Sequence, residues 1–233
     1  MQLRTDDPPP APATALVVVA HHRLRSLTAH VADLVGERLT ASGWQVDVLN
    51  LQAEGFDPRM TVEDQPDWAN RDKRYSDEVH AHMDRIRAAR IVVPVFPVYW
   101  SSVPALLKGW IDRVWNYGIA YGRSTPPLAG RRVLWLALAG AGPDDPAVGP
   151  MREVLERQLS DGIAHYCGFA ESRVEILFES EGEPQLTDAN GTLVIGDPLS
   201  ETARDAHFAA LERAAVDAVD RFAGSTAPAP VAG

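Results

Sequence analysis

Short apolar runs alternate with amphipathic segments along most of this chain of 233 residues. The runs Leu16–Ala20 and Ile91–Phe96 contain no polar residue, which is typical of strands covered on both faces. Between Ser26 and Gly43 the apolar residues instead recur at helical spacing, and Gly43 supplies a stop. We predict five strands, at Leu16–Ala20, Trp44–Leu49, Ile91–Phe96, Arg132–Ala139 and Arg173–Phe178. We predict the other helices at Ser76–Ala89, Val103–Trp115, Met151–Tyr166 and Glu201–Phe222.

Because strands alternate with helices, the pattern indicates an α/β fold with a parallel sheet between helices and right-handed crossovers. Five strands favour the flavodoxin-like order 2-1-3-4-5, in a single domain that extends from residue 15 to residue 223. We expect residues 1–14, which are acidic and proline-rich, to form a disordered arm and residues 224–233 to form a disordered tail. Residues 50–75 read as a long polar loop, and loops of that length are usually functional or disordered.

Composition and charge exclude several classes of protein. The net charge of −10 argues against a nucleic-acid partner, because nucleic acids select basic faces. No apolar run is long enough to span a bilayer, and residues 1–14 lack the basic and apolar regions of a signal peptide. The single cysteine, Cys167, permits no intrachain disulfide. These features predict a cytoplasmic protein without a membrane span.

The loop after the first strand is a candidate phosphate site. It reads Ala20-His21-His22-Arg23-Leu24-Arg25-Ser26, without the glycines of a classical dinucleotide site or the lysine of a P-loop. Free N–H groups and the positive end of the helix dipole favour phosphate there. The candidate donors are His21, Ser26 and the helix start near Leu27 and Thr28. The alternative is that Ser26 is an N-cap while the histidines and Arg23 are solvated.

The loop after the third predicted strand carries the strongest signal for a binding site. The strand Ile91–Phe96 runs into Pro97, and Pro104 then starts an amphipathic helix. The loop between them lies at the carboxyl end of its strand, where open α/β sheets bind ligands. Three large apolar side chains in this loop suit a flat aromatic ligand: Val98, Tyr99 and Trp100.

Together these segments resemble the flavodoxin-fold NAD(P)H:quinone oxidoreductases. That family includes the DT-diaphorases, their bacterial relatives and the ancillary flavoproteins of glutathione-gated potassium-efflux systems. The similarity extends from about Leu16 to about Phe178. Its most specific part is Phe96-Pro97-Val98-Tyr99-Trp100 with Pro104-Ala105-Leu106-Leu107-Lys108-Gly109-Trp110-Ile111-Asp112-Arg113-Val114. Further matches are Ala20-His21 with Ser26-Leu27-Thr28, Ala120-Tyr121-Gly122, His165–Phe169 and Pro66–Val79, the last of which resembles a bacterial branch.

The resemblance implies a bound flavin, FAD or FMN, at the carboxyl edge of the sheet, with NAD(P)H as the electron donor. It implies that the flavin phosphate is held by His21, Ser26, Leu27 and Thr28, and Arg23 of the same loop is a further candidate cofactor-binding residue. It implies that the flavin ring lies between two walls, one of Pro97, Val98, Tyr99 and Trp100 and the other of Ala139, Gly140 and Ala141. It also implies a homodimer in which Tyr121 reaches the partner's pocket. The expected substrate-pocket residues are Trp100, Tyr121 and Trp68.

The predicted reaction is two-electron hydride transfer from NAD(P)H to the flavin and then to a quinone or related aromatic acceptor, in ping-pong order. Hydride passes directly between these groups, so no catalytic side chain is expected. Two alternatives are a regulatory flavoprotein subunit of a potassium-efflux system and a tailoring flavoenzyme of natural-product biosynthesis. Diaphorases carry a Tyr and a His after the glycine-rich turn, whereas Pro143–Pro150 contains neither. Backbone donors, another side chain or water must therefore stabilise the reduced flavin.

The remaining candidates are expected to be structural. The histidines show no zinc spacing with cysteine or acidic partners, so we predict no metal site. Cys167 is expected to be a buried, inert thiol. Trp110 and Trp115 are expected to pack into the sheet or a dimer contact. Lys108 and Arg113 are expected to lie on the solvated face of their helix or to cap carbonyls near its end.

Overall fold

The computed structural model describes residues 13–182, 185–187, 192–195 and 199–224. Within them, a five-stranded parallel sheet has the order β2-β1-β3-β4-β5. The strands are β1 (Thr14–Val19), β2 (Gln45–Asn50), β3 (Ile91–Pro97), β4 (Arg132–Leu138) and β5 (Glu171–Leu177). The predicted flavodoxin-like order is confirmed, and each strand end lies within two residues of its expected position.

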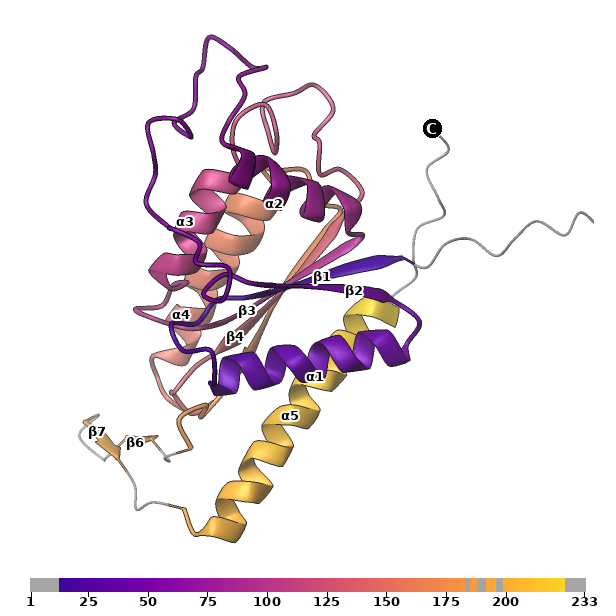
Figure 1. Cartoon of the computed structure of the whole chain (residues 1–233). Helices are drawn as coiled ribbons and strands as arrows, with labels where there is room; N and C mark the ends of the chain where they lie inside the picture. Colours follow the sequence, from indigo (N-terminus) through magenta and orange to yellow (C-terminus); the bar gives the residue numbers. More distant parts are fainter. Residues whose placement is uncertain (1–12, 183–184, 188–191, 196–198, 225–233) are drawn as a thin grey trace, which may run out of the picture.

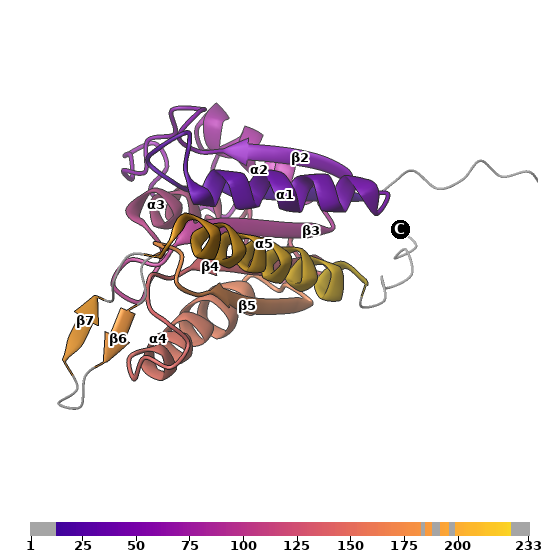
Figure 2. The same ribbon diagram turned by 90° about the horizontal axis from the view of Figure 1, so that it is seen from below.

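Helices cover both faces of the sheet, as Figures 1 and 2 show. One face carries α1 (Leu27–Ala41) and α5 (Glu201–Gly224), and the other carries α2 (Asp77–Ala88), α3 (Ala105–Val114) and α4 (Val148–Leu155). Alternate side chains of β3 point to opposite faces, and all of its first six residues are buried. The apolar runs read from the sequence are therefore apolar because a helix layer packs on each side of the strand.

The helix after β4 differs from its prediction. It begins at Val148 rather than Met151 and continues beyond Leu155 as a π-helix, η1 (Glu156–Ala164). At its end the N–H of His165 donates to the carbonyl of Ser160, five residues earlier, at 2.9 Å. A periodic apolar pattern does not distinguish this spacing from that of an α-helix, so the sequence shows the helix but not its type.

The structure also differs from the predicted elements at a short hairpin and at the start of the first strand. A hairpin of β6 (Gln185–Thr187) and β7 (Leu193–Ile195) has no predicted counterpart, because strands of three residues leave too short a pattern. β1 begins at Thr14, inside the segment expected to be an arm. The other residues of that arm and of the tail, 1–12 and 225–233, lie outside the described residues. None of the described helices is both long and apolar enough to cross a membrane.

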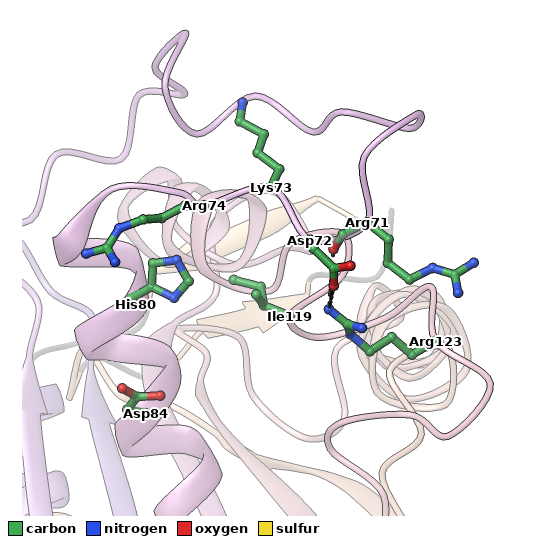
Figure 3. Close-up of a pocket in the computed structure, with 8 residues that line it drawn as sticks. All are labelled: Arg71, Asp72, Lys73, Arg74, His80, Asp84, Ile119 and Arg123. Carbon is green, nitrogen blue, oxygen red and sulfur yellow. Dashed lines mark hydrogen bonds and ion pairs between the residues drawn. The ribbon is translucent and has the colours of Figure 1, made fainter.

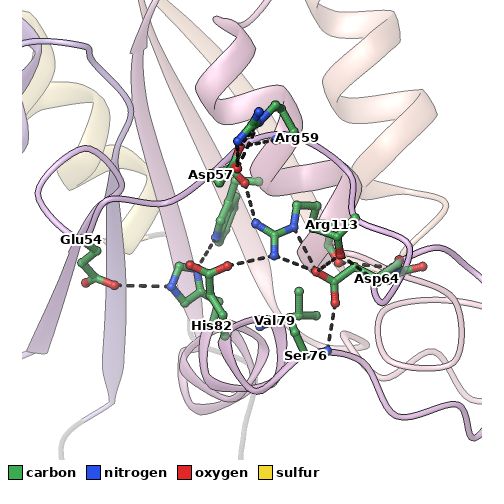
Figure 4. A network of polar contacts seen from close by, with 12 residues as sticks. Glu54, Asp57, Arg59, Asp64, Ser76, Val79, His82 and Arg113 are labelled. Atoms are coloured by element: carbon green, nitrogen blue, oxygen red, sulfur yellow. Dashed lines mark hydrogen bonds and ion pairs between the residues drawn. The ribbon is translucent and has the colours of Figure 1, made fainter.

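A buried ion pair fixes the long loop between β2 and α2 to α3 (Figure 4). Asp64 of the loop is fully buried and accepts hydrogen bonds at 2.7 and 3.1 Å from the guanidinium of Arg113. Arg113 also lies 2.9 Å from Glu78 and donates to the carbonyl of Asp57. The expectation that Arg113 is solvated or caps its own helix is wrong, because its side chain neutralises a carboxylate that the loop buries. Lys108, in contrast, is half-exposed and pairs with Asp112, as a solvated residue should.

A helical glycine brings the same loop against α3. A Cβ at Gly109 would lie 2.1 Å from the carbonyl oxygen of Pro58 and 2.4 Å from its Cβ. Gly109→Ala must therefore displace the loop, and we expect it to lower the free energy of unfolding by about 2 kcal/mol despite the better helix propensity of alanine. The control is Gly36→Ala in α1, whose new Cβ would meet only Val46 at 3.7 Å. Gly36→Ala should raise the free energy of unfolding, measured in urea, by about 0.5–1 kcal/mol. An equal rise for Gly109→Ala would contradict the close contact between Gly109 and Pro58.

Candidate functional site

A pocket of about 230 Å³ lies at the carboxyl edge of the sheet. Its walls come from the ends of β1 and β3 and from the start of α3. Eight residues line it: Ala20, His21, His22, Pro97, Tyr99, Pro104, Ala105 and Leu106. The loop predicted to hold phosphate and the loop predicted to hold a flat ring therefore share one pocket.

The loop after β1 runs into a capped helix. The hydroxyl of Ser26 accepts a hydrogen bond from the N–H of Ala29 at 3.2 Å, so Ser26 is the N-cap of α1. The N–H groups of Leu27 and Thr28 come before that bond and have no acceptor inside the helix. The capping role of Ser26 is thus compatible with an anion site, because the cap satisfies Ala29 and leaves two earlier donors.

Charge around this loop favours an anion. Arg23 and Arg25 are exposed, and the first turn of α1 contains no acidic residue. Nδ1 of His21 accepts a hydrogen bond from the N–H of Arg23 at 3.0 Å, and the His21 and His22 rings stack with centroids 4.4 Å apart. Burial is the main cause that lowers the pKa of His21. The hydrogen bond with the backbone of Arg23 raises this pKa, and the nearby charges of His22 and Arg23 lower it further, so the net shift is downward. His21 is therefore neutral at about pH 7, and the arginines supply the positive charge.

The loop after β3 contains a strained turn. The N–H of Tyr99 donates to the carbonyl of Ser102 at 2.9 Å, and the N–H of Ser102 donates to the carbonyl of Tyr99 at 3.0 Å. Between them Trp100 and Ser101 have φ values of 52° and 55°. This left-handed conformation costs residues with side chains about 1–2 kcal/mol each. Trp100 is 100% exposed, and a strained turn that presents a whole tryptophan indicates a binding surface.

The second predicted wall of the ring follows β4, the strand beside β3. The N–H of Ala139 donates to the carbonyl of Leu177 on β5 at 2.9 Å, which fixes the start of the Ala139-Gly140-Ala141 turn. The N–H of Val98 donates to the carbonyl of Leu138 at 2.8 Å, which joins the loop after β3 to the same place. Of the predicted cofactor residues, His21, Pro97 and Tyr99 line the pocket itself. The others lie in the same three segments: Arg23, Ser26, Leu27, Thr28, Val98, Trp100, Ala139, Gly140 and Ala141.

A separate cluster of aromatic side chains contains the other predicted site residues. The Trp68 ring lies 6.4 Å from that of Tyr121 and 5.0 Å from that of Tyr117, and Tyr121 lies 5.2 Å from Tyr166. Trp68 and Tyr121 thus come together, whereas Trp100 makes no ring contact with them among the described residues. Burial raises the pKa of Tyr121 to about 12, so its phenol stays protonated. Sequence reasoning assigns no role to Tyr117 or Tyr166. The available signal for Tyr117 is Gly122, because a Cβ at Gly122 would lie 2.3 Å from the Tyr117 ring.

Cys167 is buried, as predicted, and burial raises the pKa of its thiol to about 12. The thiolate is the reactive form, so the folded protein should resist alkylation. We expect iodoacetamide at about pH 8 to leave the native protein unmodified and to modify Cys167 in urea, as measured by mass spectrometry. Equal rates of alkylation in the two states would contradict a buried thiol.

A second pocket, of about 530 Å³, lies between residues 71–74, α2 and the loop after α3 (Figure 3). An ion pair within its lining joins Arg123 to Asp72 at 2.7 Å. Figure 3 shows Arg71 and Lys73 pointing away from its centre, so the cations do not converge on one point. We therefore assign no anion to it. In the part of the chain that the structure describes, no group of His, Cys, Asp and Glu side chains forms a metal site.

Comparison with known proteins agrees with this architecture. A sequence profile for proteins with a flavodoxin-like fold matches residues 13–192, so the chain belongs to that family. The uncharacterized NAD(P)H oxidoreductase YcaK of Escherichia coli (strain K12) is 44% identical over 153 residues, which cover 66% of this chain and 76% of YcaK. NAD(P)H dehydrogenase (quinone) 1 of Rattus norvegicus is 29% identical over 178 residues, which cover 66% of this chain and 65% of that enzyme.

One further relative bears on the regulatory alternative, and one solved structure bears on the fold. The ancillary protein KefF of a glutathione-regulated potassium-efflux system, from Enterobacter sp. (strain 638), is 36% identical over 126 residues, which cover 53% of this chain and 65% of KefF. General stress protein 14 of Treponema denticola, solved in complex with FMN, matches 91% of this chain and 99% of its own with a TM-score of 0.60 at 24% identity. The structural match supports the fold.

Proposed function

We propose that this protein is a flavin-dependent NAD(P)H oxidoreductase that reduces quinones or related aromatic acceptors by two-electron hydride transfer in ping-pong order. The observation that carries the proposal is the pocket shared by the loops after β1 and β3. His21 and His22 line it from the loop that leads into the capped start of α1, and Tyr99 lines it from the turn that carries the exposed Trp100. That arrangement suits a ligand with a phosphate at one end and a flat ring at the other. The relatives named as an NAD(P)H oxidoreductase and a quinone dehydrogenase support the same reaction.

The residues at the sheet edge fit a flavin, either FAD or FMN. The N–H groups of Leu27 and Thr28, with the positive charge of Arg23, would bind its phosphate. The wall that begins at Pro97 and ends at Trp100 would lie along the ring, and the small residues 139–141 would permit close approach from β4. The FMN in the related Treponema denticola fold supports a flavin cofactor. Mass spectrometry of the flavin released by heat distinguishes FAD from FMN.

A bound flavin supplies the two-electron carrier, and the protein positions and polarises it. The apolar side chains of Pro97, Pro104 and Leu106 in the pocket lining would shield a bound ring in part from water, and no side chain has to form a bond. Because Pro143–Pro150 contains neither Tyr nor His, another donor must face the charge that develops on the ring. The N–H groups of Gly140 and Ala141 are the donors that we assign, since the described chain provides no acceptor for either.

Trp68 and Tyr121 would join this site through a second subunit. Within one chain their cluster does not contact Trp100, yet Trp68 is 66% exposed and Trp100 is 100% exposed. In a homodimer, the aromatic cluster with Trp68 and Tyr121 of one subunit would pack against the Tyr99–Ser102 turn of the other and cover both exposed tryptophans. The two surfaces together would form a slot that binds nicotinamide first and the acceptor next. Light scattering should therefore report a dimer. A cytoplasmic location agrees with the free, buried thiol of Cys167.

Steady-state kinetics tests the proposed reaction. The purified protein should oxidise NADH or NADPH when a quinone is added, and double-reciprocal plots should give parallel lines because donor and acceptor use one site in turn. A panel of quinones, azo dyes and nitroaromatics, run with each nicotinamide donor, identifies the preferred pair. Flavin-saturated protein that transfers hydride to none of these acceptors would contradict the proposal.

A regulatory role in potassium efflux is the second candidate, and its support is the similarity to KefF. Co-purification with a membrane transporter, together with altered ion flux on removal of the protein, would favour that role over a free-standing enzyme. A tailoring flavoenzyme of natural-product biosynthesis would use the same site and differ in its acceptor. Poor activity with simple quinones and strong activity with a polycyclic aromatic substrate would favour that alternative.

A further inference from the structure

The strained Tyr99–Ser102 turn has a side-chain anchor far away in the sequence. The hydroxyl of Ser102 donates a hydrogen bond to Oε1 of Gln158 at 3.0 Å, across 56 residues of chain. Both residues are half-buried, so water competes only in part for this bond. Among the described residues, no other side-chain hydrogen bond holds the Tyr99–Ser102 turn.

We propose that Gln158 is a positioning residue for the flavin, because it holds the turn in the conformation that presents Trp100. The inference rests on the proposed function, since it assigns Gln158 to the same site. The two backbone bonds between Tyr99 and Ser102 close the turn but are compatible with more than one turn type. Trp100 and Ser101 occupy a φ region that favours glycine, so an unanchored turn relaxes to another conformation.

The π-helix explains why Gln158 can act as a rigid anchor. η1 begins at Glu156, two residues before Gln158, and π-helical turns occur often at functional sites. On the sheet side, the hydroxyls of Ser160 and Ser172 lie 2.8 Å apart, and Nε1 of Trp135 donates to Ser172 at 3.1 Å. The π-helix is thus tied to β4 and β5 through these bonds and to the turn through Gln158, which links the turn to the rigid sheet.

Three substitutions test the anchor. Gln158→Leu removes the acceptor at similar size, Gln158→Glu keeps an acceptor, and Ser102→Ala removes the donor. We expect Gln158→Leu and Ser102→Ala each to raise the Kd for FMN or FAD about fivefold, the factor that one hydrogen bond contributes. The double variant should bind flavin no more weakly than either single variant, because both substitutions remove the same hydrogen bond. Gln158→Glu should stay within about twofold of the wild type. Glu156→Leu, at an exposed position of the same helix, is the matched control and should bind flavin normally.

Two readouts separate positioning from a merely structural role. In a Ser101→Gly background only Trp100 remains strained in the left-handed region, so Gln158→Leu should weaken flavin binding less than it does in the wild-type background. In flavin-free protein, hydrogen exchange of the peptide that contains Ser102 should be faster in Gln158→Leu and unchanged in Glu156→Leu. If the wild type binds no flavin, the proposed function and this inference both fail. If the wild type binds flavin and Gln158→Leu matches it in affinity and exchange, only this inference is overturned.

Discussion

Arg113→Met is expected to lower the free energy of unfolding by about 3–5 kcal/mol, because it leaves the carboxylate of Asp64 buried without its cation. Asp64 is 0% exposed, and the guanidinium supplies two of its hydrogen bonds. The substitution also removes the bond to the carbonyl of Asp57, so the long loop loses two of its ties to α3. Urea unfolding measures the loss.

Lys108→Met is the matched control for Arg113→Met, because it removes a cation from the same helix. Lys108 pairs with Asp112 at 2.6 Å, but the two side chains are 43% and 46% exposed. Exposed pairs contribute at most about 1 kcal/mol, so the control should be nearly neutral. Equal losses for the two variants would show that the pair between Arg113 and Asp64 is not specially buried.

The stability difference between wild type and Arg113→Met should depend on pH. Burial raises the pKa of Asp64, but hydrogen bonds from Ser76, Arg113 and Thr61 outweigh it and hold the pKa below its usual range. The folded pKa is therefore lower than the unfolded one, so the carboxylate contributes stability above about pH 4 that is lost as the pH falls. The difference between the two proteins should shrink on acidification, and a constant difference would contradict an ionised Asp64.

Ala105→Trp should weaken flavin binding roughly a hundredfold, which corresponds to about 2–3 kcal/mol of overfilling. Ala105 lines the pocket of about 230 Å³, where an indole would occupy the space proposed for the cofactor. It is also exposed at the first position of α3, so the larger side chain should leave the fold intact. Fluorescence titration with FMN and FAD measures the affinity, and circular dichroism confirms the fold.

Lys108→Trp places the same indole on the same helix but outside the pocket lining, so it is the control for Ala105→Trp. It should retain wild-type flavin affinity. Normal affinity in Ala105→Trp, with the control behaving as expected, would mean that the cofactor does not occupy this pocket.

Much of the fold was predictable because parallel strands leave an unambiguous pattern. β3 and β4 are buried along nearly their whole length, so they read as continuous apolar runs, and the loops that follow them could be placed at one sheet edge. Ser26 was recognisable as a cap, and its hydroxyl does cap α1, while its place in an anion site stays a prediction. These signals are local, so a single sequence contains them.

The features that sequence reasoning did not reach depend on distant partners or unusual backbone. Arg113 is buried because Asp64 lies opposite it, 49 residues earlier in the chain, and no local pattern reports that contact. The left-handed φ values of Trp100 and Ser101 carry no signal because glycine or asparagine normally marks such a turn. The bond from Ser102 to Gln158 depends on a π-helical register that resembles an α-helix in sequence.

An anaerobic titration of the flavin-loaded protein with NADH and with NADPH tests the central claim most directly, namely that the carboxyl edge of the sheet holds a flavin that exchanges hydride with nicotinamide. The visible absorbance of the bound flavin should bleach with about one equivalent of the better donor and return on addition of about one equivalent of quinone. A colourless protein that takes up neither FAD nor FMN, or a bound flavin that neither donor bleaches, would contradict it.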